Sequence, residues 1–116
     1  SEFLYKILIY ENKKNKHMGN IKLGPINFEN KTADISYFIG EKNYWGQGIT
    51  TKAIKMIINL AKKKFKLKKL QAGHWEKNIA SKKVLLKNKF KLEGILKSQI
   101  QTKKGRINRY LYGLVI

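Results

Sequence analysis

The 116-residue chain has no cysteine, a single proline and only seven acidic residues. Without cysteine it cannot form disulfides, thiolate metal sites or a cysteine nucleophile, and we expect no metal site. No apolar run approaches the roughly 20 residues of a membrane-spanning helix, and no signal peptide is recognisable. We therefore expect a cytoplasmic protein without a membrane partner. The length predicts one domain over residues 1–116, long enough to bury a core.

The scarcity of acids leaves a net charge of +19, from 26 Lys and Arg residues. Such a charge attracts polyanions, nucleic acid included, through counterion release. A dedicated nucleic-acid-binding domain is nevertheless disfavoured, because the lysines are spread over the whole chain. Arginine, the better reader of phosphate and guanine, occurs only at Arg106 and Arg109. No helix-turn-helix, zinc-finger or ribonucleoprotein motif is present either.

Hydrophobic periodicity predicts six strands and two helices. Alternating or β-branched stretches predict strands over residues 5–10, 17–27, 32–39, 69–75, 90–102 and 107–116. Amphipathic patterns predict helices over 49–66 and 78–88, with Ile79, Ala80, Val84 and Leu85 of the second helix facing the core. Gly24-Pro25 interrupts the second strand and predicts an edge or a bulge. The order βββαβαββ, without repeats or linkers, indicates an α/β (α+β) domain with a mixed sheet.

The turn between the third strand and the first helix carries two closely spaced glycines, in Tyr44-Trp-Gly-Gln-Gly48. Glycines permit a tight turn and let backbone N–H groups approach a bound group closely. The N-terminus of the following helix adds free N–H groups and a positive dipole end, so the turn predicts a pyrophosphate site. Walker A and dinucleotide glycine patterns do not fit. The alternative is a connection that simply needs two glycines.

Three segments resemble the Gcn5-related N-acetyltransferase (GNAT) superfamily, in order and spacing. They are residues 35–54, the motif Asn78-Ile-Ala-Ser81 with Val84-Leu-Leu-Lys87, and Phe90-Lys-Leu-Glu-Gly94. Within the superfamily the chain is similar to the branch of ribosomal-protein N-terminal and spermidine acetyltransferases. The resemblance implies a mostly antiparallel mixed sheet flanked by helices. It also implies acetyl-CoA as cosubstrate and transfer of acetyl to a primary amine by direct attack.

The resemblance also implies the cofactor-binding residues. Backbone groups near Phe38 and Ile39 would pair with the pantetheine arm, and the turn would hold the pyrophosphate. The turn positions are Asn43, Trp45, Gly46, Gln47, Gly48, Ile49 and Thr50, with Lys52 nearby. Asn78 and Ser81 match positions that contact the cofactor, and Ser81 is a candidate general acid that protonates the departing thiolate. The alternative is that Asn78 only caps a helix and Ser81 is a small surface residue.

An amine must be neutral to attack a thioester, so a base or a water relay is needed. Asp34 and His74 are the leading candidate bases, and Glu93 ranks below them. Each could instead be an ordinary partner for lysines. Tyr37 and Trp45 are expected to serve packing. The acceptor stays open among an amino-sugar nucleotide, a protein N-terminus and a polyamine, and the positive charge favours an anionic one.

The chain departs from the family at three places. Asn43 stands where the family's loop usually begins with Gln, Arg or His. Lys89 occupies the usual glycine position after the second helix, so we expect Asn88 to adopt the left-handed conformation instead. The family's first strand and one or two helices would precede Tyr5, so we expect an N-terminally truncated domain. An apolar sheet face left bare by those helices would favour a homodimer. An acetyl-CoA-binding module without full catalysis is therefore the second hypothesis, and a basic nucleic-acid-binding domain the third.

Overall fold

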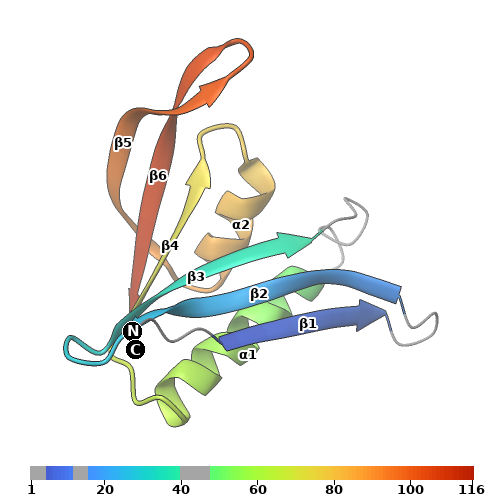
Figure 1. The fold of residues 1–116 in the computed structure, drawn as a ribbon, viewed down its shortest axis with the longest axis vertical. Coiled ribbons are helices and arrows are strands. Elements are labelled where there is room, and N and C mark those ends of the chain that lie inside the picture. Colours follow the sequence, from blue (N-terminus) through green and yellow to red (C-terminus); the bar gives the residue numbers. More distant parts are fainter. Residues whose placement is uncertain (1–4, 12–15, 40–47) are drawn as a thin grey trace.

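The computed structural model describes residues 5–11, 16–39 and 48–116. The elements are β1 (Tyr5–Glu11), β2 (Lys16–Asn27), β3 (Thr32–Ile39), α1 (Ile49–Lys63), β4 (Lys69–Trp75), α2 (Ile79–Lys87), β5 (Lys91–Thr102) and β6 (Gly105–Val115). The predicted order βββαβαββ is confirmed (Figure 1). The predicted bounds differ by a few residues, most at the end of α1. Neither described helix is long and apolar enough to cross a bilayer.

All six strands belong to one sheet with the order β1-β2-β3-β4-β6-β5. Every neighbouring pair is antiparallel except β3 and β4, so the predicted mixed, mostly antiparallel sheet is confirmed. The parallel pairing of β3 with β4 covers only Thr32 to Asp34 against Lys69 to Gln71. Beyond these residues the two strands separate, as Figure 1 shows. The sheet is therefore split in its middle, near the head of α1.

Both helices cover the same face of the sheet, because their buried side chains belong to one core. Alternate residues of β3 and β4, such as Ile35 and Leu70, face that core. From the helices the core takes Ile54, Ile57 and Ala61 of α1 and Val84 and Leu85 of α2. Ile79 and Ala80 were expected to face inward but are exposed. In the first turn of α2 the buried residue is Ser81, and the helix reaches the hydrophobic core only from Val84 onward.

The other face of the sheet carries no described helix and is mostly polar. Lys22, Asp34, Ser36, Gln71 and Arg109 alternate with the core residues of β2, β3, β4 and β6. The expectation of a bare apolar face is therefore wrong for the residues that the structure describes. We call this surface the helix-free face.

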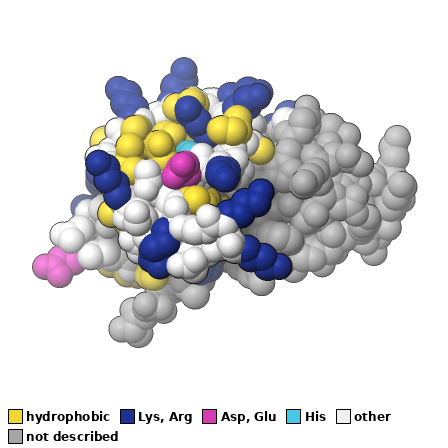
Figure 2. All heavy atoms as spheres, turned by 90° about the horizontal axis from the view of Figure 1, so that it is seen from above, with side chains coloured by type: hydrophobic (Ala, Val, Ile, Leu, Met, Phe, Trp, Pro, Cys, Tyr) yellow, Lys and Arg dark blue, Asp and Glu magenta, His cyan; other side chains and the backbone are white. Residues whose placement is uncertain are grey.

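Exposed hydrophobic side chains gather elsewhere. Leu92, Ile95 and Leu96 lie on the edge strand β5, and Trp75 ends β4. Figure 2 looks onto this end of the molecule and shows hydrophobic side chains surrounded by Lys and Arg. The positive charge that surrounds these apolar groups disfavours close approach of a second copy.

Two local backbone features bear on the sequence predictions. The bulge predicted at Gly24-Pro25 is confirmed, since the register of β2 against β3 shifts between Leu23 and Ile26. The left-handed residue after α2 is Lys89, with φ 69°, whereas Asn88 has φ −94°. The expectation for Asn88 is wrong because its side chain is already engaged.

Asn88 joins the end of α2 to the start of α1. Its Nδ2 donates to the carbonyl oxygens of Val84 (3.1 Å) and Thr51 (3.2 Å). Asn88 makes both bonds with φ −94° and ψ 16°, and the chain takes the left-handed conformation one residue later, at Lys89. The head of α1 and the end of α2 are thereby held together beside the split.

Candidate functional site

The head of α1 is built on Gly48, which is the N-cap residue with φ 74° and ψ 4°. This left-handed conformation favours glycine, and a Cβ placed there would meet no described atom within 4 Å. No described side chain caps the helix, and its first turn contains no acidic residue. The first N–H groups of α1 are therefore not covered by a side chain of their own helix, and they carry the positive end of the dipole. Ile49 and Thr50, the next predicted positions, lie in this turn.

Thr50 is fully buried, and its Oγ1 has no hydrogen-bond partner among the described residues. Asn88 Oδ1 is also buried and has no partner in the described part of the chain, while Nδ2 of the same side chain donates to the Thr51 carbonyl oxygen. Native structures leave few buried polar atoms unpaired, because each costs about 1–3 kcal/mol. Two such oxygens at the first turn of α1 fit a place where another molecule supplies the missing hydrogen bonds.

The predicted turn residues Asn43, Trp45, Gly46 and Gln47 lie outside the described residues. Phe38 and Ile39 end β3, where they pair with Asn20 and Gly19 of β2. They lie beyond the segment of β3 that pairs with β4. Among the described strands, the main chain of β3 at the split thus has a neighbour on only one side, as the pantetheine expectation requires. Lys52 is exposed on α1, and its backbone N–H donates to the Gly48 carbonyl oxygen at 3.0 Å. Its side chain has no described hydrogen bond to this turn.

The first turn of α2 brings a second set of predicted residues to the split. Asn78 is the N-cap of α2, and its Oδ1 accepts a hydrogen bond from the backbone N–H of Ser81 at 3.1 Å. Ser81 is only 4% exposed, so the alternative of a surface serine is wrong. Asn78 does cap the helix, which leaves its contact with a cofactor a prediction. Its cap fixes the backbone that carries Ser81.

Tyr37 of β3 meets Ser81 of α2 directly. The Tyr37 hydroxyl is hydrogen-bonded to Ser81 Oγ and lies 3.4 Å from the Ser81 carbonyl oxygen. Burial raises the pKa of Tyr37, and the hydrogen bond to Ser81 offsets part of that rise. The phenol therefore stays protonated at neutral pH and can donate to Ser81.

Sequence reasoning gave Tyr37 only a packing role. Its signal was its alternation with Ala33 and Ile35 on the core face of β3. The sequence does not show that β3 and β4 separate, and this separation lets the first turn of α2 contact Tyr37.

His74 does not lie open at the split. It is 5% exposed, and its Nδ1 lies 2.7 Å from the Trp75 carbonyl oxygen. Since a carbonyl only accepts, Nδ1 carries the proton, and Nε2 accepts from the Tyr112 hydroxyl at 3.2 Å. The ring also stacks on Tyr110, with centroids 5.3 Å apart. Both nitrogens are thus engaged, and this arrangement disfavours His74 as the base.

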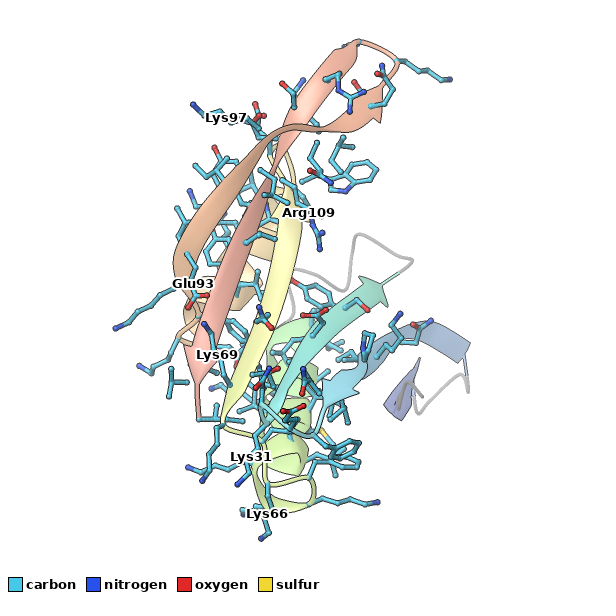
Figure 3. All side chains as sticks on the ribbon, turned by 60° about the vertical axis from the view of Figure 1, so that its left-hand side comes forward. Lys31, Lys66, Lys69, Glu93, Lys97 and Arg109 are labelled. Carbon is cyan, nitrogen blue, oxygen red and sulfur yellow. The ribbon has the colours of Figure 1, made fainter. Side chains whose placement is uncertain are left out.

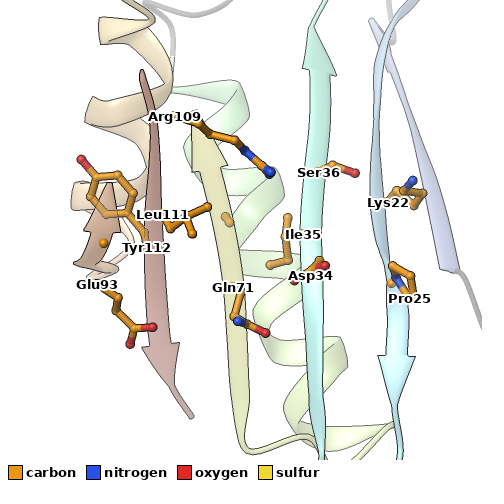
Figure 4. Close-up of a pocket in the computed structure, with 13 residues that line it drawn as sticks. Lys22, Pro25, Asp34, Ile35, Ser36, Gln71, Glu93, Arg109, Leu111 and Tyr112 are labelled. Carbon is orange, nitrogen blue, oxygen red and sulfur yellow. The ribbon is translucent and has the colours of Figure 1, made fainter. Parts of the chain in front are cut away.

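The two acidic candidates differ in their partners. Glu93 forms an ion pair with Lys69, with Nζ to Oε1 at 2.9 Å, as the lysine-partner alternative expected. Asp34 is exposed on the helix-free face and has no described side-chain partner. It lines a cavity of about 430 Å³ with Ser36, Gln71 and Arg109 (Figure 4). Among the described parts of the chain, no group of three His, Asp or Glu residues could hold a metal ion.

The structure therefore brings Tyr37, Asn78 and Ser81 together at one place and Gly48 to Thr50 at the head of α1. Asp34 lies on the opposite face of the sheet, at the same split. A cosubstrate held on the helix side could present its reactive end to a molecule entering from the helix-free face. This arrangement suits transfer of a group between two molecules.

Comparison with known proteins agrees with this geometry. The family model described as Acetyltransferase (GNAT) domain matches residues 1–91. The curated protein "Probable N-acetyltransferase YjcK" of Bacillus subtilis (strain 168) is 35% identical over 71 residues, which cover 61% of this chain and 39% of YjcK. The chain thus spans well under two thirds of the length of this relative.

Solved structures share the fold over nearly the whole chain. Ribosomal-protein-S5-alanine acetyltransferase from Vibrio fischeri has a TM-score of 0.87 at 21% identity, over 97% of this chain and 61% of that one. Microcin C7 self immunity acetyltransferase MccE, in complex with acetyl-CoA and AMP, has a TM-score of 0.82 at 27% identity, with the same coverage. The family match covers β1 to β4, with the split between β3 and β4, and both helices. The chain belongs to the acetyltransferase (GNAT) domain family.

Proposed function

We propose that the protein transfers the acetyl group of acetyl-CoA to a primary amine of a small molecule or peptide. The observation that carries the proposal is the split between β3 and β4, with an uncapped helix start and the Tyr37–Ser81 pair beside it. Family membership supports the same reaction, and the MccE structure contains acetyl-CoA.

The residues present fit the cosubstrate. The N–H groups that follow Gly48 would bind its pyrophosphate, because a helix start offers free donors and a positive dipole end. The main chain of β3 at Phe38 and Ile39 would pair with the pantetheine arm. Its thioester would then lie near Ser81, within reach of the buried hydroxyl.

Ser81 would act as the general acid. As the amine nitrogen bonds to the acetyl carbon and the carbon–sulfur bond breaks, the Ser81 hydroxyl donates its proton to the sulfur. The Tyr37 hydroxyl donates a hydrogen bond to Ser81 Oγ and stabilises the charge that develops there. Asp34 is the acidic group that remains open on the acceptor side, and we propose that it receives the amine proton, directly or through water.

Calorimetric titration with acetyl-CoA tests the cosubstrate site. Gly48→Val should lower the affinity at least tenfold, because a β-branched residue does not adopt a positive φ and the turn must rearrange. Gly105→Val is the matched control, since Gly105 also has a positive φ and open space for a Cβ, but lies in the β5–β6 turn. Equal affinities of the two variants would contradict the proposed site.

A thiol-release assay with a mixed amine panel tests the reaction itself. Turnover that Ser81→Ala abolishes, with acetyl-CoA affinity unchanged, would support the transferase. Binding of acetyl-CoA with no turnover of any amine would support the second hypothesis, a module that binds the cosubstrate without full catalysis.

A further inference from the structure

Arg109 lies on the helix-free face in an unusual position. It belongs to β6 and pairs in register with Trp75 of β4. Its guanidinium lies over Gly73, where an added Cβ would come within 3.1 Å of Nε and 3.3 Å of Nη2. The side chain therefore crosses β4 at the one residue without a side chain. Figures 3 and 4 show it reaching past β4 toward β3.

The charge of Arg109 is not used by the described part of the protein. It makes no hydrogen bond or ion pair there, whereas Arg106 donates to the carbonyl oxygens of Ser98 and Gln99 and to Gln101 Oε1. A guanidinium remains charged at every accessible pH and offers a planar fork of donors. An unpaired exposed arginine is ordinary by itself. Its placement over Gly73, at the split, is what indicates a ligand.

The surroundings of Arg109 form a cavity of about 430 Å³, within the size range of small-molecule sites. The cavity carries separated charges, with Arg109 and Lys22 as cations and Asp34 as an unpaired anion. Glu93 also lines it, but its charge is paired with Lys69 at 2.9 Å. The cavity lies where β3 and β4 part, on the side opposite Tyr37 and Ser81.

We propose that Arg109 binds an anionic group, a carboxylate or a phosphate, on the amine that accepts the acetyl group. The inference rests on the proposed function and names its acceptor class. The ammonium end of the acceptor faces Asp34, which takes its proton, and the anionic end forms paired hydrogen bonds with the guanidinium. A polyamine would place positive charge beside Arg109 and Lys22, so this arrangement excludes it as the preferred acceptor.

Calorimetry with matched amines tests the inference. Ethanolamine is compared with phosphoethanolamine, and β-alaninamide with β-alanine, with and without CoA. The chain should bind the anionic member of at least one pair tenfold or more tightly, since charge-assisted bonds are strong. The pair that shows the larger difference tells phosphate from carboxylate.

Arg109→Gln should remove that preference, and Arg109→Lys should restore only part of it, because a lysine lacks the planar fork. Arg106→Gln changes the net charge equally and should keep the preference. Equal binding within both pairs by the unaltered chain, or equal losses in the Arg109→Gln and Arg106→Gln variants, would overturn the inference.

Acetyl-CoA titration of the same variants separates this inference from the function on which it rests. All should bind acetyl-CoA with similar affinity, because Arg109 lies across the sheet from the head of α1. Failure of the unaltered chain to bind acetyl-CoA would refute the proposed transferase. In that case, a preference for anionic amines that depends on Arg109 would still show an anion site. Absence of that preference as well would show that both the proposed function and the anion site are wrong.

Discussion

At the scale of single residues, the proposed chemistry depends on two hydroxyl groups in one hydrogen bond. Ser81 is a poor acid alone, because an alkoxide near an apolar core is costly. Tyr37 lowers that cost by donating to Ser81 Oγ, and its raised pKa keeps it protonated for this purpose. The proposed mechanism therefore makes Tyr37 a positioning and stabilising residue for Ser81.

Replacing Tyr37 with Phe retains the ring and removes the hydroxyl. We expect kcat to fall about tenfold, with acetyl-CoA affinity unchanged, since the lost hydrogen bond matters mainly when charge develops on Ser81. Steady-state kinetics and calorimetry measure the two quantities. Tyr110→Phe, which alters a half-buried tyrosine stacked on His74, is the matched control and should leave kcat within twofold. A fall in kcat for Tyr110→Phe as large as that for Tyr37→Phe would contradict the proposed role of Tyr37.

Tyr37 also predicts a dependence of stability on alkaline pH. Its pKa is raised in the folded protein, so the folded state holds this proton more tightly than the unfolded chain. The protonated Tyr37 therefore contributes to the free energy of unfolding. This contribution is complete below pH ~10, the ordinary pKa of tyrosine, and is lost as the pH rises through the pKa of Tyr37 in the folded state. Lysines titrate in the same range, so urea unfolding of the unaltered protein and Tyr37→Phe must be compared. The difference between them should fall above pH 10, and a constant difference would contradict the assignment.

At the scale of elements, hydrophobic periodicity was enough to predict every strand and helix and their order. Alternation on β3 and the amphipathic pattern of α1 depend on local sequence, which a single chain displays. The split between β3 and β4 and the position of Arg109 over Gly73 could not be predicted, because both depend on which strands become neighbours. The turn after α2 was misplaced by one residue, because the hydrogen bond of Asn88 to Thr51 depends on the position of α1.

The turn after α2 offers a stability prediction. Lys89 has φ 69°, and a left-handed conformation costs an L-residue roughly 1–2 kcal/mol. Glycine avoids this cost but loses about 0.5–1 kcal/mol of backbone entropy, so Lys89→Gly should raise the free energy of unfolding by roughly 0.5–1 kcal/mol. Lys83→Gly, in the middle of α2, should lower it by about 1 kcal/mol. Urea denaturation gives both values, and the same sign for both variants would show that strain at Lys89 is negligible.

At the scale of the whole molecule, the net charge of +19 acts on folding and on ligand binding in opposite directions. The molecule extends 41 × 41 × 27 Å, so at ~10 mM salt, where the Debye length is about 30 Å, most of its charges repel one another. Screening of that repulsion stabilises the fold. The same screening weakens the attraction of a cosubstrate that carries several phosphate charges.

Raising NaCl from 10 to 150 mM should therefore raise the thermal midpoint of the protein and lower its affinity for acetyl-CoA. The affinity should fall less steeply for dephospho-CoA, which lacks the 3′-phosphate and therefore has fewer charges to screen. Sucrose at matched osmolality is the control, because it raises the midpoint without screening and should leave affinity unchanged. An affinity that does not change with salt would mean that the N–H groups of α1 bind without help from the surrounding lysines. A thermal midpoint that does not change with salt would mean that water alone screens the repulsion between the lysines.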